Sequence, residues 1–404
     1  MFKYATRVGC LRPSPSNEIS NLAIELKAQG RDVISLATGE PDFDTPEPIR
    51  QAAEQAIHSG VTRYTPTAGF LSLRQAIAQK YSVEYQTSIH PDEIIITCGA
   101  KHAISLALQC LVEPGESVLL PTPAWTNFGP MIELAGASIL PLPLFEEDGF
   151  KPNLDRLKRM AVPAGVKGII LNSPNNPTGA VLSRDDLVRI VCWALQRDLW
   201  IISDEVYDKI LFEEIEHTPI ASLGPEVRAH TIVANGLSKT YAMSGWRIGW
   251  AIADGAFIQK MVAMQSQTTQ NAPSFAQSAA IAAIRLASSF VDEMVDIYDS
   301  RRQYCMRRLN TLHSHLSYVE PKGAFYFFIN LGKWLSEREM TDTEFCRQLL
   351  LQQGIALVPG TAFGKERYVR LSYATSSENL ANAFNRLDKF LNAPENQKDC
   401  PRSI

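Results

Sequence analysis

The stretch NGLSKTYAMSGWRIGW, residues 235–250, places a lysine among small residues, with an arginine eight positions after it. It follows the β-branched run HTIVA (230–234), so Lys239 lies just beyond the carboxyl end of a predicted strand. Open α/β sheets bind ligands at that end, and small neighbours let a bulky group approach the backbone. The stretch therefore predicts a ligand site at a sheet edge containing Lys239 and Arg247, rather than a surface lysine and an ordinary helix arginine.

Seven short apolar runs predict the sheet to which this edge belongs. They are EIIIT (93–97), SVLLP (117–121), SILPL (138–142), KGIILN (167–172), LWIIS (199–203), HTIVA (230–234) and RIGWAIA (247–253). Their lack of polar alternation is typical of strands buried on both faces. Helical patterns separate most of them, such as residues 100–112 and the run 183–198 that Ser183 caps. We therefore predict an α/β fold with a mostly parallel sheet and helices on both faces.

The remaining segments divide the chain into three predicted parts. Residues 1–48 are expected to form an amino-terminal arm and part of a small domain, and residues 49–292 a large ligand-binding domain. Residues 293–404 contain the aromatic runs GAFYFFIN and YVRLSYA with helical patterns around them, which indicates a smaller α+β domain.

Composition narrows the class of partner. The 404 residues are 45% apolar and 20% charged, and 39 basic and 43 acidic residues are well mixed along the chain. This balance favours small molecules over nucleic acid or a membrane surface. The first twenty residues lack an apolar core of signal-peptide length, so we expect a cytoplasmic protein. The seven cysteines are scattered without a C-x-x-C pair, and neither a disulfide framework nor a metal site is expected.

A lysine at such an edge has a specific chemical use. Its amine can condense with an aldehyde, as lysine does with pyridoxal 5′-phosphate, and Arg247 is suited to the phosphate of that cofactor. The run G-L-S-K-x-x-A-M-x-G-x-R-I-G resembles, position by position, the lysine attachment motif of class I aminotransferases. It is most similar to the aspartate aminotransferase subgroup of fold type I, and the resemblance extends from GEPDFDTP to YVRLSYATS.

The segment SDEVY follows the strand LWIIS, 35 residues before the lysine. By itself an acidic pair after a strand is more often a helix cap. The resemblance implies that Asp204 lies at the pyridine nitrogen of the cofactor, where a carboxylate keeps that nitrogen protonated. It also implies that Tyr207 donates a hydrogen bond to the phenolic oxygen of the cofactor.

The loop NSPNNPTG follows the strand KGIILN and demands a sharp turn at the same edge of the sheet. The resemblance places Asn176, directly before the proline, on the phenolic oxygen. Asn175 is the alternative residue for this contact. A second alternative is a plain Asn-Pro turn with no role in binding.

TCGAKHAI opens a helix after the strand EIIIT, so the backbone amides of Gly99, Ala100 and Lys101 are expected to face an anion. A simple strand-to-helix turn that binds no anion would have the same sequence pattern. In the subgroup that this chain resembles, a lysine here reaches the distal carboxylate of the substrate, which makes the Lys101 side chain a selectivity candidate. In PTPAW, Trp125 is expected to stack on the cofactor ring, although a tryptophan is usually part of a core.

Five further residues complete the predicted site. Ser238 directly precedes the lysine, and Tyr64 in YTPTAG resembles the tyrosine that reaches the phosphate of a neighbouring subunit, which implies a homodimer. Arg370 in YVRLSYA lies in an apolar strand and needs an anion. The resemblance implies that this anion is the substrate α-carboxylate and that the backbone of Gly39 approaches it, with a buried structural salt bridge as the alternative. Arg12 is a further expected substrate contact.

These residues predict a ping-pong transamination that uses pyridoxal 5′-phosphate. Arg370 would hold the amino acid while the Lys239 amine moves the proton of Cα. Aspartate is the expected donor and 2-oxoglutarate the expected acceptor. Aromatic, methionine, alanine or prephenate-type substrates are alternatives, as is a lyase on the same fold. A nicotinamide enzyme is disfavoured because no G-x-G-x-x-G follows the first strand. Ala100 and Ala124 depart from the usual pattern of the subgroup and bear on selectivity.

Overall fold

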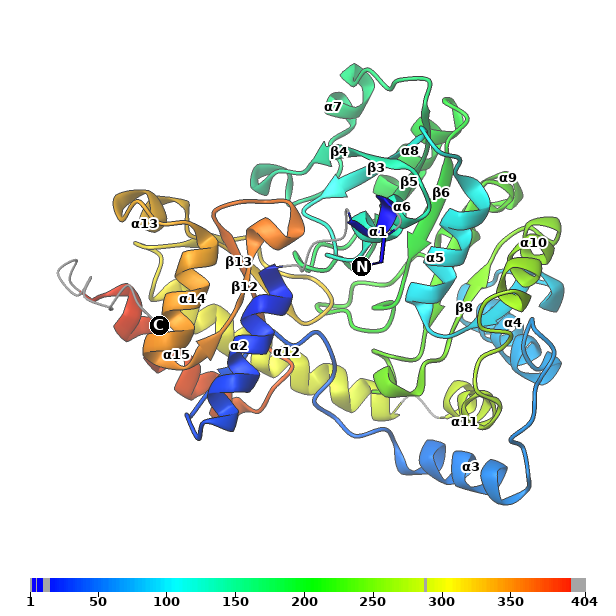
Figure 1. The fold of residues 1–404 in the computed structure, drawn as a ribbon, viewed down its shortest axis with the longest axis horizontal. Coiled ribbons are helices and arrows are strands. Elements are labelled where there is room, and N and C mark those ends of the chain that lie inside the picture. Colours follow the sequence, from blue (N-terminus) through cyan, green and yellow to red (C-terminus); the bar gives the residue numbers. More distant parts are fainter. Residues whose placement is uncertain (1, 5, 10–14, 287–288, 394–404) are drawn as a thin grey trace.

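The computed structural model describes residues 2–4, 6–9, 15–286 and 289–393. Its larger unit is built on a seven-stranded sheet in the order β2-β8-β7-β6-β5-β3-β4 (Figure 1). The strands are β2 (Ile94–Thr97), β3 (Ser117–Thr122), β4 (Ser138–Pro143), β5 (Val166–Asn172), β6 (Trp200–Asp204), β7 (Thr231–Gly236) and β8 (Gly249–Ile252). Each overlaps one of the predicted runs. Only β8 runs against its neighbours, so the predicted, mostly parallel α/β sheet is confirmed.

The strands bury alternate side chains in two cores. Ile94 and Ile96 of β2 belong to one core, and Ile95 belongs to the other. Both faces are apolar because helices cover both, which explains the lack of polar alternation in the sequence. The helices of this unit are α3 (Glu47–His58), α4 (Leu71–Tyr85), α5 (Ala100–Leu111), α6 (Phe128–Leu134), α7 (Leu154–Arg159), α8 (Arg184–Leu195), α9 (Pro225–Ala229), α10 (Gly255–Ser266) and α11 (Ser274–Arg285). Ser183 caps α8 as predicted, through a reciprocal capping box with Asp186.

The smaller unit contains two further sheets. A four-stranded sheet has the order β12-β13-β10-β9, and β1 pairs with β11 in a parallel ribbon. The strands are β1 (Ile34–Ser35), β9 (Ser317–Tyr318), β10 (Tyr326–Asn330), β11 (Ile355–Ala356), β12 (Val358–Pro359) and β13 (Tyr368–Ser372). The helices around them are α2 (Pro15–Ala28), α12 (Ser289–Asn310), α13 (Gly332–Glu337), α14 (Asp342–Gln353) and α15 (Ser377–Leu391), while α1 (Thr6–Gly9) lies against α6 of the larger unit.

The amino-terminal arm connects the two units. Its strand β1 lies in the smaller unit, whereas α3, which follows within a dozen residues, packs on α11 of the larger one. Helix α12 runs from the larger unit into the smaller one (Figure 1). The predicted boundary at 292/293 falls inside this helix, and the division into domains stays a prediction.

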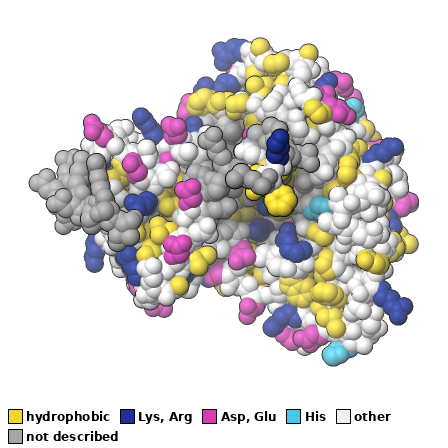
Figure 2. Space-filling model, viewed as in Figure 1, with side chains coloured by type: hydrophobic (Ala, Val, Ile, Leu, Met, Phe, Trp, Pro, Cys, Tyr) yellow, Lys and Arg dark blue, Asp and Glu magenta, His cyan; other side chains and the backbone are white. Residues whose placement is uncertain are grey.

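The distribution of surface charge and the apolar length of the helices bear on whether nucleic acid or a membrane could be a partner. On the face in Figure 2, basic and acidic side chains are interspersed. Among the described helices, none is by itself long and apolar enough to cross a membrane, and α11 and α12 reach the required length and composition only as a pair bent by 79°.

Candidate functional site

One edge of the large sheet brings the predicted motifs together. In the parallel register Asn172 pairs with Asp204 and Asp204 with Ala234, so β5, β6 and β7 end side by side. Strand β2 runs in the same direction because two antiparallel pairings separate it from β7, and α5 therefore starts at this edge as well. Strand β8 begins here, which places Arg247, two residues before it, at the same edge.

The Lys239 amine lies in the interior of this edge. Its Nζ donates a 2.5 Å hydrogen bond to the carbonyl of Gly39 and lies 6.0 Å from the centre of the Tyr207 ring. Burial lowers the pKa of Lys239 to about 8, against the opposing charge of Glu40. A larger fraction of this amine is therefore uncharged near neutral pH than in an ordinary lysine, as a nucleophile or base requires.

Asp204 ends β6 with its side chain buried. Burial raises its pKa to about 7, although the N–H of Val206 donates to Oδ1 at 3.3 Å and favours the charged form. A carboxylate at this depth is stabilised by a cationic partner, such as a protonated ring nitrogen.

The start of α5 forms an anion-binding cradle with Arg247. Gly99 has φ 89° and no side chain caps the helix, so the first amides of α5 are not used by a cap. The positive φ favours glycine at position 99, and a Cβ there would lie 2.6 Å from Nη2 of Arg247 and displace the guanidinium. The guanidinium donates to the carbonyls of Ser244 (2.7 Å) and Cys98 (3.1 Å). A phosphate fits this combination of helix start and guanidinium.

Arg370 forms a second anion site, on a strand of the smaller unit. It is buried on β13 and donates to Oδ1 of Asn176 at 3.0 Å and to the carbonyl of Ala37 at 2.5 Å. Its Nε is buried and has no hydrogen-bond partner in the described part of the chain. A Cβ on Gly39 would come within 3.8 Å of Nη1, so the predicted neighbours Gly39 and Arg370 are adjacent. An orphaned donor on a buried guanidinium fits an incoming carboxylate.

The two asparagines of the NSPNNPTG loop have different surroundings. Oδ1 of Asn175 accepts from the N–H and the hydroxyl of Thr178 and so closes the turn. Asn176 contacts Arg370 instead, and its backbone N–H donates to Oδ1 of Asn172. Of the two alternatives, Asn176 is the one whose side chain contacts another predicted site residue.

Lys101 in the first turn of α5 and Trp125 after β3 lie together. The Lys101 amine is 5.3 Å from the centre of the indole ring. Burial and the charge of Arg247 lower the pKa of Lys101. Across the described ranges 2–4, 6–9, 15–286 and 289–393, no carboxylate lies within ion-pair distance of Lys101, Arg247 or Arg370. The structural carboxylate considered for Arg370 is therefore absent from the described residues, and the cations suit a ligand with several negative groups.

The remaining predicted residues are Ser238, Tyr64 and Arg12. Ser238 is partly buried beside Lys239. Tyr64 is 86% exposed on the loop between α3 and α4. Arg12 lies outside the described residues.

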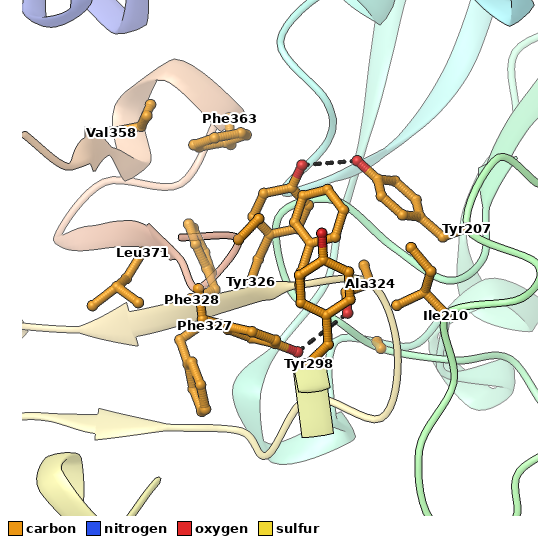
Figure 3. Close-up of a cluster of buried hydrophobic side chains, with 14 of the residues drawn as sticks. Tyr207, Ile210, Tyr298, Ala324, Tyr326, Phe327, Phe328, Val358, Phe363 and Leu371 are labelled. Carbon is orange, nitrogen blue, oxygen red and sulfur yellow. Dashed lines mark hydrogen bonds between the residues drawn. The ribbon is translucent and has the colours of Figure 1, made fainter. Parts of the chain in front are cut away.

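Tyr326, which no motif in the sequence marks, lies at the centre of the site. Its hydroxyl is 2.8 Å from that of Tyr207, and both side chains are buried (Figure 3). Its ring lies under the guanidinium of Arg370, 4.5 Å from Cζ to the ring centre. Only the antiparallel register of β10 and β13 brings it there. The run GAFYFFIN reads as a plain aromatic strand, so local pattern carries no sign of this role.

Residues 31–387 match the family described as "Aminotransferase class I and II". The chain is 41% identical over 390 residues to the aspartate aminotransferase of Pyrococcus abyssi, covering 95% of this chain and 97% of that one. It is 37% identical over 388 residues to the aspartate/prephenate aminotransferase of Thermus thermophilus, covering 95% and 98%.

Solved structures give the same result. The aspartate aminotransferase of Thermus thermophilus with maleate superposes with a TM-score of 0.90 at 36% identity, covering 96% of this chain and all of that one. The aromatic aminotransferase of Pyrococcus horikoshii superposes with a TM-score of 0.84 at 41% identity, covering 92% and 98%.

Proposed function

This chain belongs to the class I and II aminotransferase family, and on that premise we propose that it moves the amino group of aspartate to a 2-oxo acid. As a member of the family it is a transaminase that depends on pyridoxal 5′-phosphate. The observation that supports aspartate as the substrate is the pair of cations Arg370 and Lys101. Neither has a carboxylate partner in the described chain. Aspartate brings two carboxylates, one for each.

The residues at the sheet edge divide the contacts to the cofactor. Lys239 would be the attachment residue, Asp204 would pair with the ring nitrogen, and Tyr207 and Asn176 would donate to the ring oxygen. Arg247, Ser238 and the amides of Gly99, Ala100 and Lys101 would hold the phosphate, and Trp125 would cover the ring. Support comes from the shared edge of β2, β5, β6 and β7, from the uncapped start of α5 and from the buried Asp204 carboxyl.

The bound cofactor supplies a ring that withdraws electrons from the substrate Cα. Arg370 and the backbone of Gly39 hold the α-carboxylate, which fixes the direction of the Cα–H bond. The Lys239 amine, with its pKa near 8, would accept this proton from Cα of the donor amino acid. In the second half-reaction the protonated amine would give a proton to Cα of the amino acid formed from the acceptor. Release of the first oxo acid precedes binding of the second in a ping-pong sequence. We take 2-oxoglutarate as the acceptor because it is also a dicarboxylate.

Two properties of the whole protein belong to the proposal. Tyr64 is exposed and available to a second copy, where it would contact the phosphate, so we propose a homodimer with shared sites. A cytoplasmic location stays a prediction.

A second candidate substrate class is aromatic or prephenate-like oxo acids. It is favoured by the names of two similar proteins, an aspartate/prephenate and an aromatic aminotransferase. Arg12, the residue expected to contact such acids, lies outside the described chain.

The test compares substrates on wild-type protein and two Lys101 variants. The visible band of the loaded protein should bleach with aspartate, and kcat/KM should be higher for aspartate than for phenylalanine, methionine, alanine or kynurenine. Lys101→Ala should lower kcat/KM for aspartate about 10- to 100-fold, the value of a hydrogen bond to a charged group. The value for alanine should stay within about twofold, and Lys101→Arg should recover part of the loss. Equal losses for aspartate and alanine would contradict the role of Lys101.

A further inference from the structure

We propose that Tyr326 is a positioning residue that directs the hydroxyl of Tyr207 toward the cofactor and supports the guanidinium of Arg370. The proposal deepens the proposed function and rests on it for the contact between Tyr207 and the cofactor. It assigns a role to a side chain that no local motif marks. Figure 3 shows the two phenols meeting above the aromatic cluster of the smaller unit.

The contact between the two tyrosines crosses from one unit to the other. Tyr326 begins β10 and is fully buried, while Tyr207 follows β6 of the large sheet. Their hydroxyl oxygens are 2.8 Å apart, and their rings meet edge to face with centres 5.9 Å apart at 83°. Phe325 packs against Tyr207 in the same way at 5.5 Å. Both phenols are therefore held in place by ring packing as well as by their hydrogen bond.

Counting protons decides which tyrosine donates when the site is loaded. A phenol has one O–H, so a Tyr207 that donates to Tyr326 has no proton left for a ligand. When Tyr207 donates to the cofactor oxygen, Tyr326 can donate to Tyr207, and both protons are used. Within the described residues the Tyr326 hydroxyl makes no other hydrogen bond. Gly39 lies beside it, so that an added Cβ would be 3.0 Å from the hydroxyl oxygen, but glycine has no side chain that could accept the bond. The chain Tyr326 to Tyr207 to ligand also polarises the second bond and strengthens it.

The ring of Tyr326 serves a separate purpose. The Arg370 guanidinium lies over two aromatic rings, 4.5 Å from the centre of Tyr326 and 5.1 Å from that of Phe363. This arrangement stabilises a cation whose desolvation is costly. Tyr326 thus acts with its hydroxyl on the ring-oxygen donor and with its face on the carboxylate clamp. The two actions can be separated by mutation.

Tyr326→Phe removes the hydroxyl and keeps the ring. We expect kcat for aspartate to fall about 3- to 10-fold, the value of one hydrogen bond. The pH midpoint of the cofactor's visible absorbance should rise, because a weaker donor at the ring oxygen leaves more negative charge there. The charged groups facing this pair are Arg370 on β13, Asp204 at the end of β6 and Lys239 after β7, and all are unchanged in the variant. KM for aspartate and Kd for maleate should stay within about twofold of wild type.

Three further variants define how the effect reaches the cofactor. In a Tyr207→Phe background, Tyr326→Phe should change neither kcat nor the midpoint, since it acts through Tyr207. Tyr326→Leu removes the ring as well, and should raise Kd for maleate at least about threefold through loss of the cation–π contact. Placing 3-fluorotyrosine at position 326 keeps the hydroxyl and makes it a stronger donor, so the midpoint should move below that of wild type.

The matched control is Tyr373→Phe, which removes another buried hydroxyl of this cluster, one that donates to the Ala324 carbonyl at 3.2 Å. It should lower stability without moving the midpoint. Additive effects of Tyr207→Phe and Tyr326→Phe, or a Tyr326→Phe midpoint equal to that of Tyr373→Phe, would overturn the proposal. The midpoint needs no substrate, so failure of aspartate to bleach the band would contradict the proposed substrate alone. Should Tyr326→Phe not fold, the 3-fluorotyrosine protein decides.

Discussion

Asp204 and Lys239 show how burial tunes two ionisable groups in opposite directions. The pKa of Asp204 is raised to about 7 and that of Lys239 is lowered to about 8, in both cases chiefly by desolvation. Each group is therefore closer to its uncharged form than it would be in water. The carboxylate is useful only when a cation faces it, and the amine only when it is free to attack or to take a proton. A site of this kind reduces the stability of the protein without its ligand.

We predict that Asp204→Asn stabilises the cofactor-free protein at pH 8. A folded-state pKa near 7, against an ordinary value of 3.8, means that the carboxyl destabilises the fold increasingly as pH rises from about 4 to about 7. The neutral amide avoids this penalty, so the free energy of unfolding should rise by roughly 1–3 kcal/mol at pH 8. Near pH 4 the gain should vanish.

Urea unfolding of the cofactor-free variant and wild type at pH 4, 6 and 8 provides the measurement. The loaded variant should at the same time lose at least about 100-fold in kcat, since the ring nitrogen loses its charged partner. A gain in stability that is the same at all three pH values would show that titration of Asp204 is not its origin.

Motif chemistry predicts Lys239 and Asp204 because they lie after and at strand ends that are visible in the sequence, and Arg370 because it is a charged residue inside an apolar strand. Tyr326 and Phe363 flank Arg370 only through strand register and loop packing. Nothing in the residues around them marks these contacts.

At the scale of elements, the segment 39–45 is bound to the loop that carries Lys239. Besides the contact from Lys239 to the Gly39 carbonyl, Ser244 donates to Glu40 at 2.7 Å. The Thr45 hydroxyl donates to the Ala242 carbonyl at 2.7 Å and accepts from Nε1 of Trp246 at 2.9 Å. The loop needs this support, because Ala242 and Arg247 have φ values of 50° and 58°, which are unfavourable for residues other than glycine.

Thr45→Val should therefore loosen the lysine loop while keeping the side-chain shape. Loss of the bridging hydroxyl leaves the Trp246 N–H and the Ala242 carbonyl without this partner, at a cost of about 1–3 kcal/mol in the free energy of unfolding. Because Arg247 belongs to the same loop, the cofactor should also bind more weakly. Equilibrium dialysis of pyridoxal 5′-phosphate and urea unfolding measure the two effects. Thr45→Ser keeps the hydroxyl and should lie close to wild type in both, and equal losses in the two variants would contradict the bridge.

The elements themselves follow closely from local sequence, and their arrangement does so only in part. All seven predicted runs are strands of one sheet, since their apolar residues need burial on both faces. The antiparallel direction of β8 does not follow from its apolar pattern. It arises because the short turn through Ser244–Trp246 returns the chain beside β7 instead of crossing over a helix. The edge position of β2 likewise depends on which strands close on it, a tertiary property.

At the scale of the whole molecule, the site lies between two units whose relative position it needs. Arg370, Tyr326 and Phe363 come from the smaller unit, and Lys239 and Asp204 from the larger one. Glu146, after β4 of the large sheet, joins the units away from the site. Its Oε2 accepts from Tyr368 at 2.8 Å and Asn330 at 2.7 Å, and its Oε1 from Ser317 at 2.8 Å. One carboxylate thus contacts three strands of the small sheet.

Glu146→Ala should weaken this junction much more than Glu147→Ala, which removes the adjacent carboxylate. Three donors lose a charged acceptor, so the free energy of unfolding should fall by about 2–3 kcal/mol. Glu147 is the matched control, because its side chain is 65% exposed and pairs only with Arg156 in the described chain. Glu147→Ala should change stability by less than about 0.5 kcal/mol. Urea unfolding measures both, and the Kd of maleate reports the alignment of Arg370 with the large sheet. If Glu146→Ala and Glu147→Ala were equally stable and bound maleate equally well, the two units would be held together without Glu146.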